Sequence, residues 1–358
     1  MKKIILLCFL ILLSACGKDE DETKNIDRKA MIENYAEIIL QSYSKTSLSA
    51  DSLQECVNNF VAHPDTTHLQ LAQEALLQLY EDFQGITFLD FGPSEQLLLR
   101  ESLNTYPADT TNIKLIIQTG SYNIGTVANR SKGLPAIEYL LFGIGSSREE
   151  IAAYYTANSY KDYLQATTNE VKRIFSEVYS MWQNDSGTGY YKTFVAAQGL
   201  DINSALGLMV NSLCLDFEKY FRDGKLGIPL GIRTLGIPQL DKVESLYAGK
   251  SLNLIIRNME SIKSFYSGGN GQGLYDYLNA IGAKYNEQPL SAEIISKMDT
   301  IITRANALEG ESIEYNILHN KEAVENLYAS CQELILLLKI DMTSAMSILI
   351  TYQDTDGD

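Results

Sequence analysis

Near its middle the chain carries the stretch Gly133-Leu134-Pro135-Ala136-Ile137-Glu138-Tyr139-Leu140-Leu141-Phe142-Gly143. Apolar side chains and the ring of a tyrosine surround a single carboxylate there, that of Glu138. Pro135 suits the first turn of a helix, where its missing N–H costs nothing, and Gly143 suits the position after a helix end. Residues 136–142 therefore read as about two turns of a helix that is apolar on nearly all sides, which is typical of a buried helix.

Glu138 is the residue of this stretch that calls for an explanation. An unpaired buried carboxylate costs several kcal/mol, so its side chain needs a partner, a ligand or a proton. Two interpretations stay open: Glu138 belongs to a binding site, or it only complements the dipole of its helix and bonds to nearby backbone. Gly133, at the start of the stretch, permits an unusual turn or a close approach of another backbone segment.

Length and charge set limits on the class of protein. The 358 residues suffice for one large or two medium domains. The chain has 29 Lys+Arg against 45 Asp+Glu and a net charge of −16. Such an acidic balance argues against nucleic acid and against anionic membrane surfaces as partners.

The N-terminus has the features of a targeting segment. Two lysines precede an apolar run over residues 4–13 that is too short to span a membrane as a mature helix. The run ends in Leu13-Ser14-Ala15-Cys16, which resembles the lipobox of bacterial lipoproteins. We therefore expect residues 1–15 to be a signal peptide and Cys16 to carry lipid after cleavage.

The residues after Cys16 indicate where the protein resides. Gly17 favours the outer membrane, because an aspartate at this position would suggest retention in the inner membrane. The run Lys18-Asp19-Glu20-Asp21-Glu22 resembles the acidic export tag of surface lipoproteins, although any solvated acidic tether would look the same. We expect residues 16–27 to be a tether to the outer membrane, with the folded part exposed at the cell surface or else on the periplasmic face.

Apolar residues recur at helical spacing along nearly the whole chain from residue 28 onward, and no segment has a convincing strand period. The pattern predicts an all-α fold of two helical bundles packed side by side, over residues 28–200 and 201–358. Because each half carries one irregular loop with a glutamate, a pseudo-repeat is also expected. One helix is predicted to begin near residue 28, a second to run from after Ser49 to Val61, and a third to end near Phe83. Further helices are predicted over about 94–103, 109–118, 148–182 with a break at Asn158-Ser159, 202–221, 252–265, 272–283, 290–308 and 319–351.

A second irregular segment, rich in Gly and Pro, covers residues 225–247 and carries Arg233, Glu244 and Ser245. If it meets the first stretch at the junction of the bundles, Glu138 and Glu244, with Glu218 as a further candidate, could bind a hard cation such as ferric iron or calcium through oxygen atoms. The alternative is structural: Arg233 or Arg130 pairs with Glu138 and only fixes the junction.

The stretch at 133–143 resembles the signature of the imelysin-like family, which is also catalogued as a peptidase family. That signature is Gly-x-His-x-x-Glu followed by an apolar Tyr/Phe-Leu-Leu-x-Gly run. Gly133, Glu138 and residues 139–143 match it, whereas Pro135 stands at the position of the histidine. The resemblance extends over residues 26–358 and implies a helical envelope protein linked to iron acquisition.

Pro135 decides what this resemblance implies for activity. A metallopeptidase of this family would need a metal held by His and Glu, and a proline cannot bind one. The three histidines, His63, His68 and His319, are distant from Glu138 in sequence, and no nucleophile motif is present.

The sequence therefore favours a non-catalytic envelope lipoprotein that binds a small ligand or a metal. The resemblance implies a role in iron acquisition, with iron or another hard cation as the bound metal and iron-uptake proteins as partners. A metal-dependent peptidase and a structural surface module remain the alternatives. The expected site residues are Gly133, Pro135, Glu138, Arg233, Glu244 and Ser245.

Overall fold

The computed structural model describes residues 26–120, 123–183 and 189–352. The described residues are mostly helical, and the strands found among them, β1 (Lys284–Tyr285) and β2 (Gln288–Pro289), form one small antiparallel pair. The all-α prediction is confirmed. The predicted signal peptide, Cys16 and nearly all of the tether lie outside the described residues. No described helix is long and apolar enough to cross a membrane.

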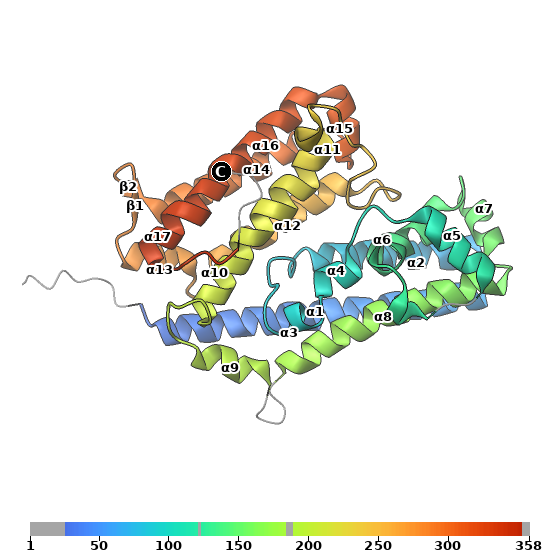
Figure 1. Ribbon diagram of the computed structural model, residues 1–358, viewed down its shortest axis with the longest axis horizontal. Coiled ribbons are helices and arrows are strands. Elements are labelled where there is room, and N and C mark those ends of the chain that lie inside the picture. Colours follow the sequence, from blue (N-terminus) through green and yellow to red (C-terminus); the bar gives the residue numbers. More distant parts are fainter. Residues whose placement is uncertain (1–25, 121–122, 184–188, 353–358) are drawn as a thin grey trace, which may run out of the picture.

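Three long helices form the centre of the N-terminal part: α1 (Arg28–Ala62), α2 (Thr66–Phe83) and α8 (Asn158–Trp182). α1 packs against both of the others (Figure 1). Each helix turns an apolar face inward, and the buried rings of Tyr43 on α1 and Trp182 on α8 pack with 6.0 Å between their centroids. The helical spacing of apolar residues in the sequence therefore identifies the faces that form this part of the core.

The prediction of a helix boundary near Ser49 is wrong, because α1 is a single helix of 35 residues. The hydroxyl groups of Ser42 and Thr46 donate to the carbonyl oxygens of Ile38 and Ser42, each four residues earlier in the same helix. Hydroxyl groups that bond back to their own helix are satisfied without a turn. A polar run in the sequence therefore passes through the middle of α1 without ending it.

Short helices cover the long ones. The stretch at residues 133–143 forms α6 (Gly133–Glu138) and the π-helical turn η3 (Tyr139–Gly143), so the predicted buried helix is confirmed and starts slightly earlier than expected. The other short helices of this part are α3 (Pro93–Gln96), α4 (Leu99–Leu103), α5 (Thr110–Thr119), η1 (Ile124–Thr126), η2 (Asn129–Ser131), α7 (Arg148–Tyr154) and α9 (Tyr190–Ala196).

The C-terminal part is built on α12 (Ser251–Tyr266), α14 (Leu290–Asn306) and α16 (Lys321–Leu336), with α14 packed between the other two. The sequence analysis does not predict α9 or α15, which have 7 residues each, or about two helical turns. The remaining elements are α10 (Ala205–Leu215), the π-helix η4 (Asp216–Gly227), α11 (Ile228–Leu230), η5 (Ile232–Thr234), α13 (Leu274–Ala280), α15 (Ile313–His319), η6 (Leu337–Met342) and α17 (Thr343–Met346).

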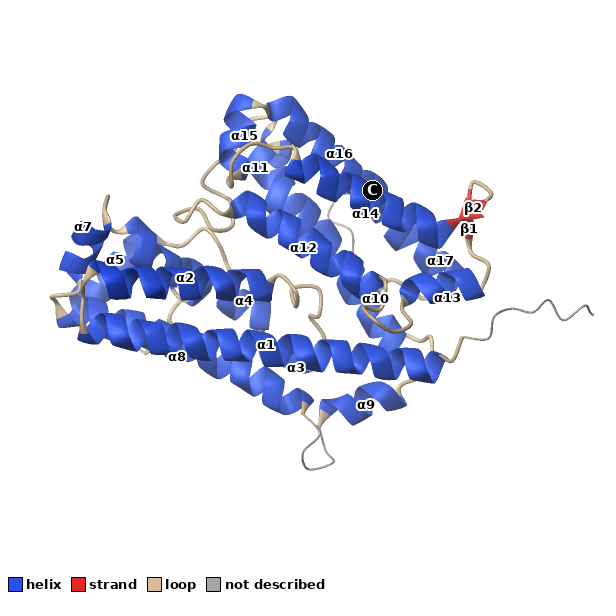
Figure 2. Cartoon of the chain, turned by 180° about the vertical axis from the view of Figure 1, so that it is seen from behind, coloured by secondary structure: helices blue, strands red, loops and turns tan. Residues whose placement is uncertain are grey.

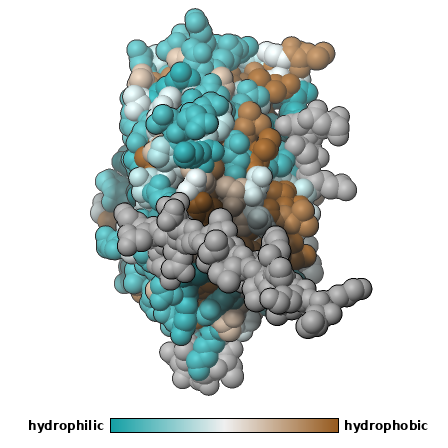
Figure 3. Space-filling view, turned by 90° about the vertical axis from the view of Figure 1, so that its left-hand side faces the viewer, coloured by the Kyte–Doolittle hydropathy of each residue, from teal (hydrophilic) through white to brown (hydrophobic). Residues whose placement is uncertain are grey.

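The helices before and after residue 200 form two groups that lie against each other (Figures 1 and 2). One buried contact shows how they are joined: the Tyr35 hydroxyl donates to the Phe265 carbonyl oxygen at 3.1 Å and accepts from the Leu274 N–H at 2.7 Å. The division of the chain into two domains at this point, and the pseudo-repeat, stay predictions. At one end of the molecule, hydrophilic residues cover the left of the view and hydrophobic residues form a band along its right side (Figure 3).

Candidate binding site

Glu138, the last residue of α6, is 1% exposed. Its Oε2 atom accepts a hydrogen bond from the Tyr80 hydroxyl of α2 at 3.3 Å, and its Oε1 atom accepts from the backbone N–H of Ala248 at 2.7 Å. Both partners come from outside its own helix, so the interpretation in which only local backbone satisfies Glu138 is wrong. The irregular segment that begins at residue 225 does approach Glu138, through the residues that directly follow Glu244 and Ser245.

Burial gives the Glu138 carboxyl group an unusual proton affinity. Loss of solvation raises its pKa from the ordinary 4.5 to about 7, although hydrogen bonds from Ala248 and Tyr80 favour the charged form. A substantial fraction of the group is therefore protonated near neutral pH. Protonation relieves part of the cost of burying this side chain.

Neither arginine considered as a partner reaches Glu138. Arg130 donates through Nε to the carbonyl oxygen of Pro107 at 2.9 Å. Arg233 pairs with Asp223, with 3.2 Å between Nε and Oδ1, and its side chain is 40% exposed. The alternative of a buried ion pair between one of these arginines and Glu138 is therefore wrong. Arg233 was expected beside Glu138, but it pairs with Asp223 instead.

Gly133 has the role that its position in the stretch suggests. Its φ of 77° lies in the left-handed region, and a Cβ atom there would lie 2.5 Å from the carbonyl oxygen of Leu103. The predicted close approach of backbone is confirmed. Pro135 lies buried in the first turn of α6 and presents only a hydrocarbon ring where the family signature has a histidine.

Glu244 is 2% exposed and belongs to a buried polar network. Its Oε2 atom forms an ion pair with Lys225. Its Oε1 atom accepts from Asn104 Nδ2 at 2.6 Å and from Gln84 Nε2 at 3.2 Å. Lys225 also donates to Gln84 Oε1 at 2.9 Å, so Gln84 and Asn104 of the N-terminal part and Lys225 and Glu244 of the C-terminal part form one connected group. Ser245, beside it, is buried with a left-handed φ of 54°.

The described residues contain no group of three or more His, Cys, Asp or Glu side chains that could hold a metal ion. Glu218, the further candidate ligand, pairs with Lys339 at 2.9 Å and accepts from the Tyr352 hydroxyl at 2.8 Å. A hard cation at Glu138 and Glu244 stays a prediction.

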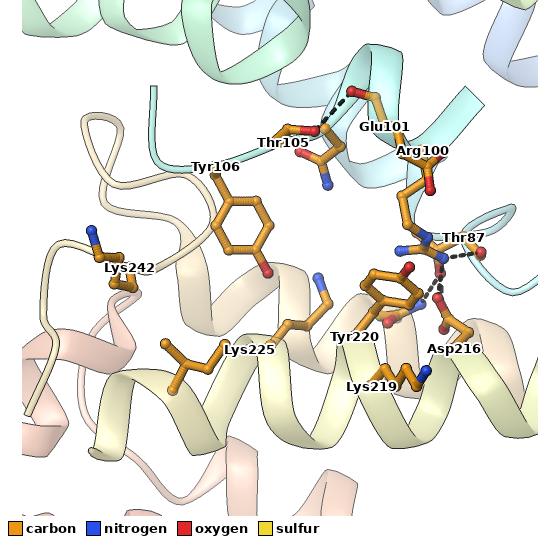
Figure 4. A pocket seen from close by; sticks show the side chains of 14 residues that line it. Thr87, Arg100, Glu101, Thr105, Tyr106, Asp216, Lys219, Tyr220, Lys225 and Lys242 are labelled. Carbon is orange, nitrogen blue, oxygen red and sulfur yellow. Dashed lines mark hydrogen bonds and ion pairs between the residues drawn. The ribbon is translucent and has the colours of Figure 1, made fainter. Parts of the chain in front are cut away.

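A pocket of about 320 Å³ opens beside the Glu244 network, between the two groups of helices (Figure 4). One wall comes from α4 and the segment that follows it, and the floor comes from η4. The pocket does not include Glu138 or Arg233, and it touches the network through Asn104 and Lys225. Its lining residues are Thr87, Arg100, Glu101, Asn104, Thr105, Tyr106, Asp216, Lys219, Tyr220, Gly224, Lys225, Ile228, Lys242 and Asn258.

Arg100 is the most tightly held cation of the pocket. Its Nη2 atom donates to the carbonyl oxygen of Thr87 and forms an ion pair with Asp216. Its guanidinium group lies 3.8 Å from the ring centroid of Tyr220, an arrangement that the negative face of the ring favours (Figure 4). Arg100 and Asp216 are both buried, so these contacts fix the guanidinium group in one orientation.

The charge of the pocket differs from that of the chain as a whole. Four cationic side chains line it, those of Arg100, Lys219, Lys225 and Lys242, against two acidic ones, Glu101 and Asp216. The complete chain has a net charge of −16. A cationic concavity in an acidic protein attracts anions to one place.

The sequence alone identifies little of this pocket. Lys225 falls within the irregular segment at 225–247, but Arg100 and Tyr106 come from α4 and the segment after it, and Asn258 comes from α12. In a helical pattern each of them looks like an ordinary polar position. The structure adds one indication, since η4 at the floor of the pocket is a π-helix and π-helical segments occur frequently at functional sites.

A comparison with known protein families confirms the family resemblance inferred from residues 133–143. The model of the family Imelysin, a peptidase family by its label, matches residues 39–339. The chain belongs to the imelysin family. Within this family it carries Pro135 where the signature quoted above has a histidine.

Two solved structures have the same fold as this chain. One is a protein from Parabacteroides distasonis ATCC 8503, provisionally named iron-regulated protein A precursor, with a TM-score of 0.75, 19% sequence identity, and coverage of 89% of this chain and 95% of that one. The other is an imelysin-like protein from Psychrobacter arcticum 273-4, with a TM-score of 0.71, 14% identity, and coverage of 91% and 97%. No curated protein matches the chain in sequence.

Proposed function

We propose that this imelysin-family protein is a non-catalytic binding protein of the outer membrane that holds a small ligand in the pocket between its two groups of helices and acts in iron acquisition. The pocket itself is the observation on which the proposal rests. Its volume of about 320 Å³ lies at the lower end of the range of small-molecule sites, and such sites often form between two packed parts of a chain.

Binding is favoured over peptidase activity by the state of the signature residues. Pro135 offers no metal ligand, and both oxygens of Glu138 accept hydrogen bonds from the protein itself. Two histidines, His63 and His68, lie together at the turn between α1 and α2, with 5.5 Å between ring centroids, and His319 ends α15. None of these residues completes a His and Glu pair of the kind that a metallopeptidase of this family would need.

The link to iron acquisition comes from resemblance. A protein of the same fold bears the name iron-regulated protein A precursor. The outer-membrane location, with lipid on Cys16 and display at the cell surface, is supported by the lipobox-like Leu13-Ser14-Ala15-Cys16 and by the acidic run after it. Iron-uptake proteins of the same membrane are the expected partners.

Release of bound molecules tests the proposal. The full chain is purified in detergent from iron-limited cells and denatured, and released compounds are identified by mass spectrometry and elemental analysis. Gly224→Leu fills the pocket, because a Cβ atom at Gly224 would lie 3.3 Å from the Lys219 carbonyl oxygen and 3.5 Å from the Tyr106 hydroxyl oxygen. Ile228→Trp fills it from a second position, and Gly125→Leu, at an exposed position, is the control.

We expect a small molecule with the wild type and with Gly125→Leu, and a large loss of it with both pocket-filling variants. Equal recovery from all four proteins would place any ligand elsewhere and refute the proposal. Cleavage of casein that a chelator stops and that Glu138→Gln abolishes would instead favour the peptidase alternative.

A further inference from the structure

We infer that the pocket binds a small hydroxy-carboxylic acid, either free or as its complex with ferric iron. The inference rests on the proposed function, because it names the class of ligand for the same pocket. Carboxylate groups are recognised by the cations of the pocket, and hydroxyl groups are recognised by side-chain oxygen atoms that have no partner in the described protein.

Arg100 has N–H donors that the described protein does not use. Only Nη2 of its guanidinium group bonds to the described protein, through Thr87 and Asp216. The Nε atom is buried without a hydrogen-bond partner among the described residues. Guanidinium groups carry five N–H donors in a planar fork that matches a carboxylate, so Arg100 retains donors for an anion.

Further donors point to the same kind of ligand. Lys225 has three N–H donors and uses two of them, toward Gln84 and Glu244. The Tyr106 hydroxyl also lines the pocket and makes no hydrogen bond to another described residue (Figure 4). Lys219 and Lys242 add positive charge to the lining. A ligand with one or more carboxylates would satisfy these donors.

Two buried side-chain amides, those of Asn104 and Asn258, have oxygen atoms without a hydrogen-bond donor among the described residues. Asn104 is 9% exposed and uses its Nδ2 atom on Glu244, while its Oδ1 atom is buried with no partner among the described residues. Asn258 is 1% exposed and uses Nδ2 on Gln84 and Thr87, and its Oδ1 atom is likewise unpartnered. A buried acceptor without a donor is costly, so a ligand with O–H donors gains affinity here.

The shape of the pocket suits such a ligand. The rings of Tyr106 and Tyr220 stand on either side of the space above Lys225 (Figure 4). They supply apolar walls for the carbon skeleton, while the charged and polar atoms lie between them. Anionic groups and hydroxyl groups on one small skeleton also bind ferric iron, which prefers oxygen ligands.

Isothermal titration of the full chain at pH 7 tests the inference with matched acids. Citrate is compared with tricarballylate, which has the same three carboxylates without the hydroxyl group, and 2,3-dihydroxybenzoate is compared with benzoate. Catechol has the hydroxyl groups without the carboxylate. Citrate and 2,3-dihydroxybenzoate are also titrated with added Fe³⁺, which distinguishes the free acid from the ferric complex as the better ligand.

We expect at least one of the two hydroxy acids to bind roughly threefold to tenfold more tightly than its hydroxyl-free counterpart, which is the effect of one or two hydrogen bonds. Catechol should bind more weakly than 2,3-dihydroxybenzoate. Tyr106→Phe should weaken binding of the hydroxy acid by a similar factor with unchanged stability. The double variant Lys219→Gln/Lys242→Gln should weaken it and reduce its salt dependence, whereas Lys284→Gln, at an exposed site with a side chain 64% exposed, should leave it unchanged.

The inference is overturned if neither hydroxy acid binds, if the hydroxyl-free acids bind equally well, or if catechol matches 2,3-dihydroxybenzoate. The proposed function is judged separately, since it fails only when the pocket-filling variants Gly224→Leu and Ile228→Trp release the same molecules as the wild type. A neutral compound that those variants exclude would leave the binding function standing and refute the hydroxy-acid class.

Discussion

The Glu138 carboxylate and the backbone N–H of Ala248 are joined by a hydrogen bond of 2.7 Å across 110 residues of sequence. The bond ties the signature helix α6 to the end of the irregular segment that carries Glu244 and Ser245. A second bond, from Tyr80 on α2, makes Glu138 the meeting point of three parts of the chain. We infer that Glu138 holds the irregular segment in place beside the pocket and is not itself a ligand group of it.

The raised pKa of Glu138 predicts a specific dependence of stability on pH. Between pH 4.5 and about 7 the folded protein retains a proton on this group that the unfolded chain has lost. The contribution of Glu138 to stability is therefore fully present below pH 4.5 and is lost as pH rises through about 7. Each pKa unit corresponds to about 1.4 kcal/mol, so the free energy of unfolding falls by up to about 3 kcal/mol over this range.

Glu138→Gln removes this titration and keeps an oxygen that can accept from Ala248. We expect the free energy of unfolding of the variant, relative to wild type, to increase from pH 4.5 to pH 8. Urea unfolding at several pH values measures the difference. A difference that stays constant over this range would contradict the raised pKa.

The ion pair of Lys225 and Glu244 predicts asymmetric effects of substitution. Lys225→Met leaves a buried carboxylate without its cation, which typically costs about 3–5 kcal/mol. The double variant Lys225→Met/Glu244→Gln should be more stable than Lys225→Met alone, because a neutral amide replaces the unpaired charge and still accepts from Asn104 and Gln84. Urea unfolding of the wild type, both single variants and the double variant measures the coupling, and simple additivity would contradict it.

How far the sequence predicts this protein depends on the range of the interactions concerned. The long helices follow from local periodicity, and the burial of Glu138 follows from its apolar neighbours in the same helix. The partners of Glu138 do not, because Tyr80 and Ala248 lie 58 and 110 residues away. The pocket depends on Arg100 meeting Asp216, which lie 116 residues apart, and nothing in either local sequence separates them from solvent-facing polar residues.

The addition of one methyl group at Gly133 should lower the free energy of unfolding by a large amount. Gly133→Ala forces a Cβ atom to 2.5 Å from the Leu103 carbonyl oxygen and also imposes a left-handed φ on alanine. Gly249→Ala is a matched control, because Gly249 has a φ of 66° and no atom within 4 Å of the added Cβ. The control should lose only the conformational term, about 1–2 kcal/mol, and Gly133→Ala should lose clearly more. Equal losses in urea unfolding would show that the backbone shifts to accommodate the methyl group.

Substitution of Leu235 by asparagine should increase the stability of the protein. Its side chain is completely exposed, and its φ of 54° is in the left-handed region that leucine avoids. Such a conformation costs about 1–2 kcal/mol for an ordinary residue, and asparagine tolerates it better. Because no packing is lost, Leu235→Asn should raise the free energy of unfolding by up to about 1 kcal/mol.

Leu318→Asn is the control for this change, since Leu318 is 63% exposed but lies in α15 with an ordinary helical backbone. There the substitution should lower stability slightly, because asparagine is the weaker helix former. A loss of stability for Leu235→Asn equal to that of the control would mean that the left-handed turn between η5 and Ile237 is not strained by leucine.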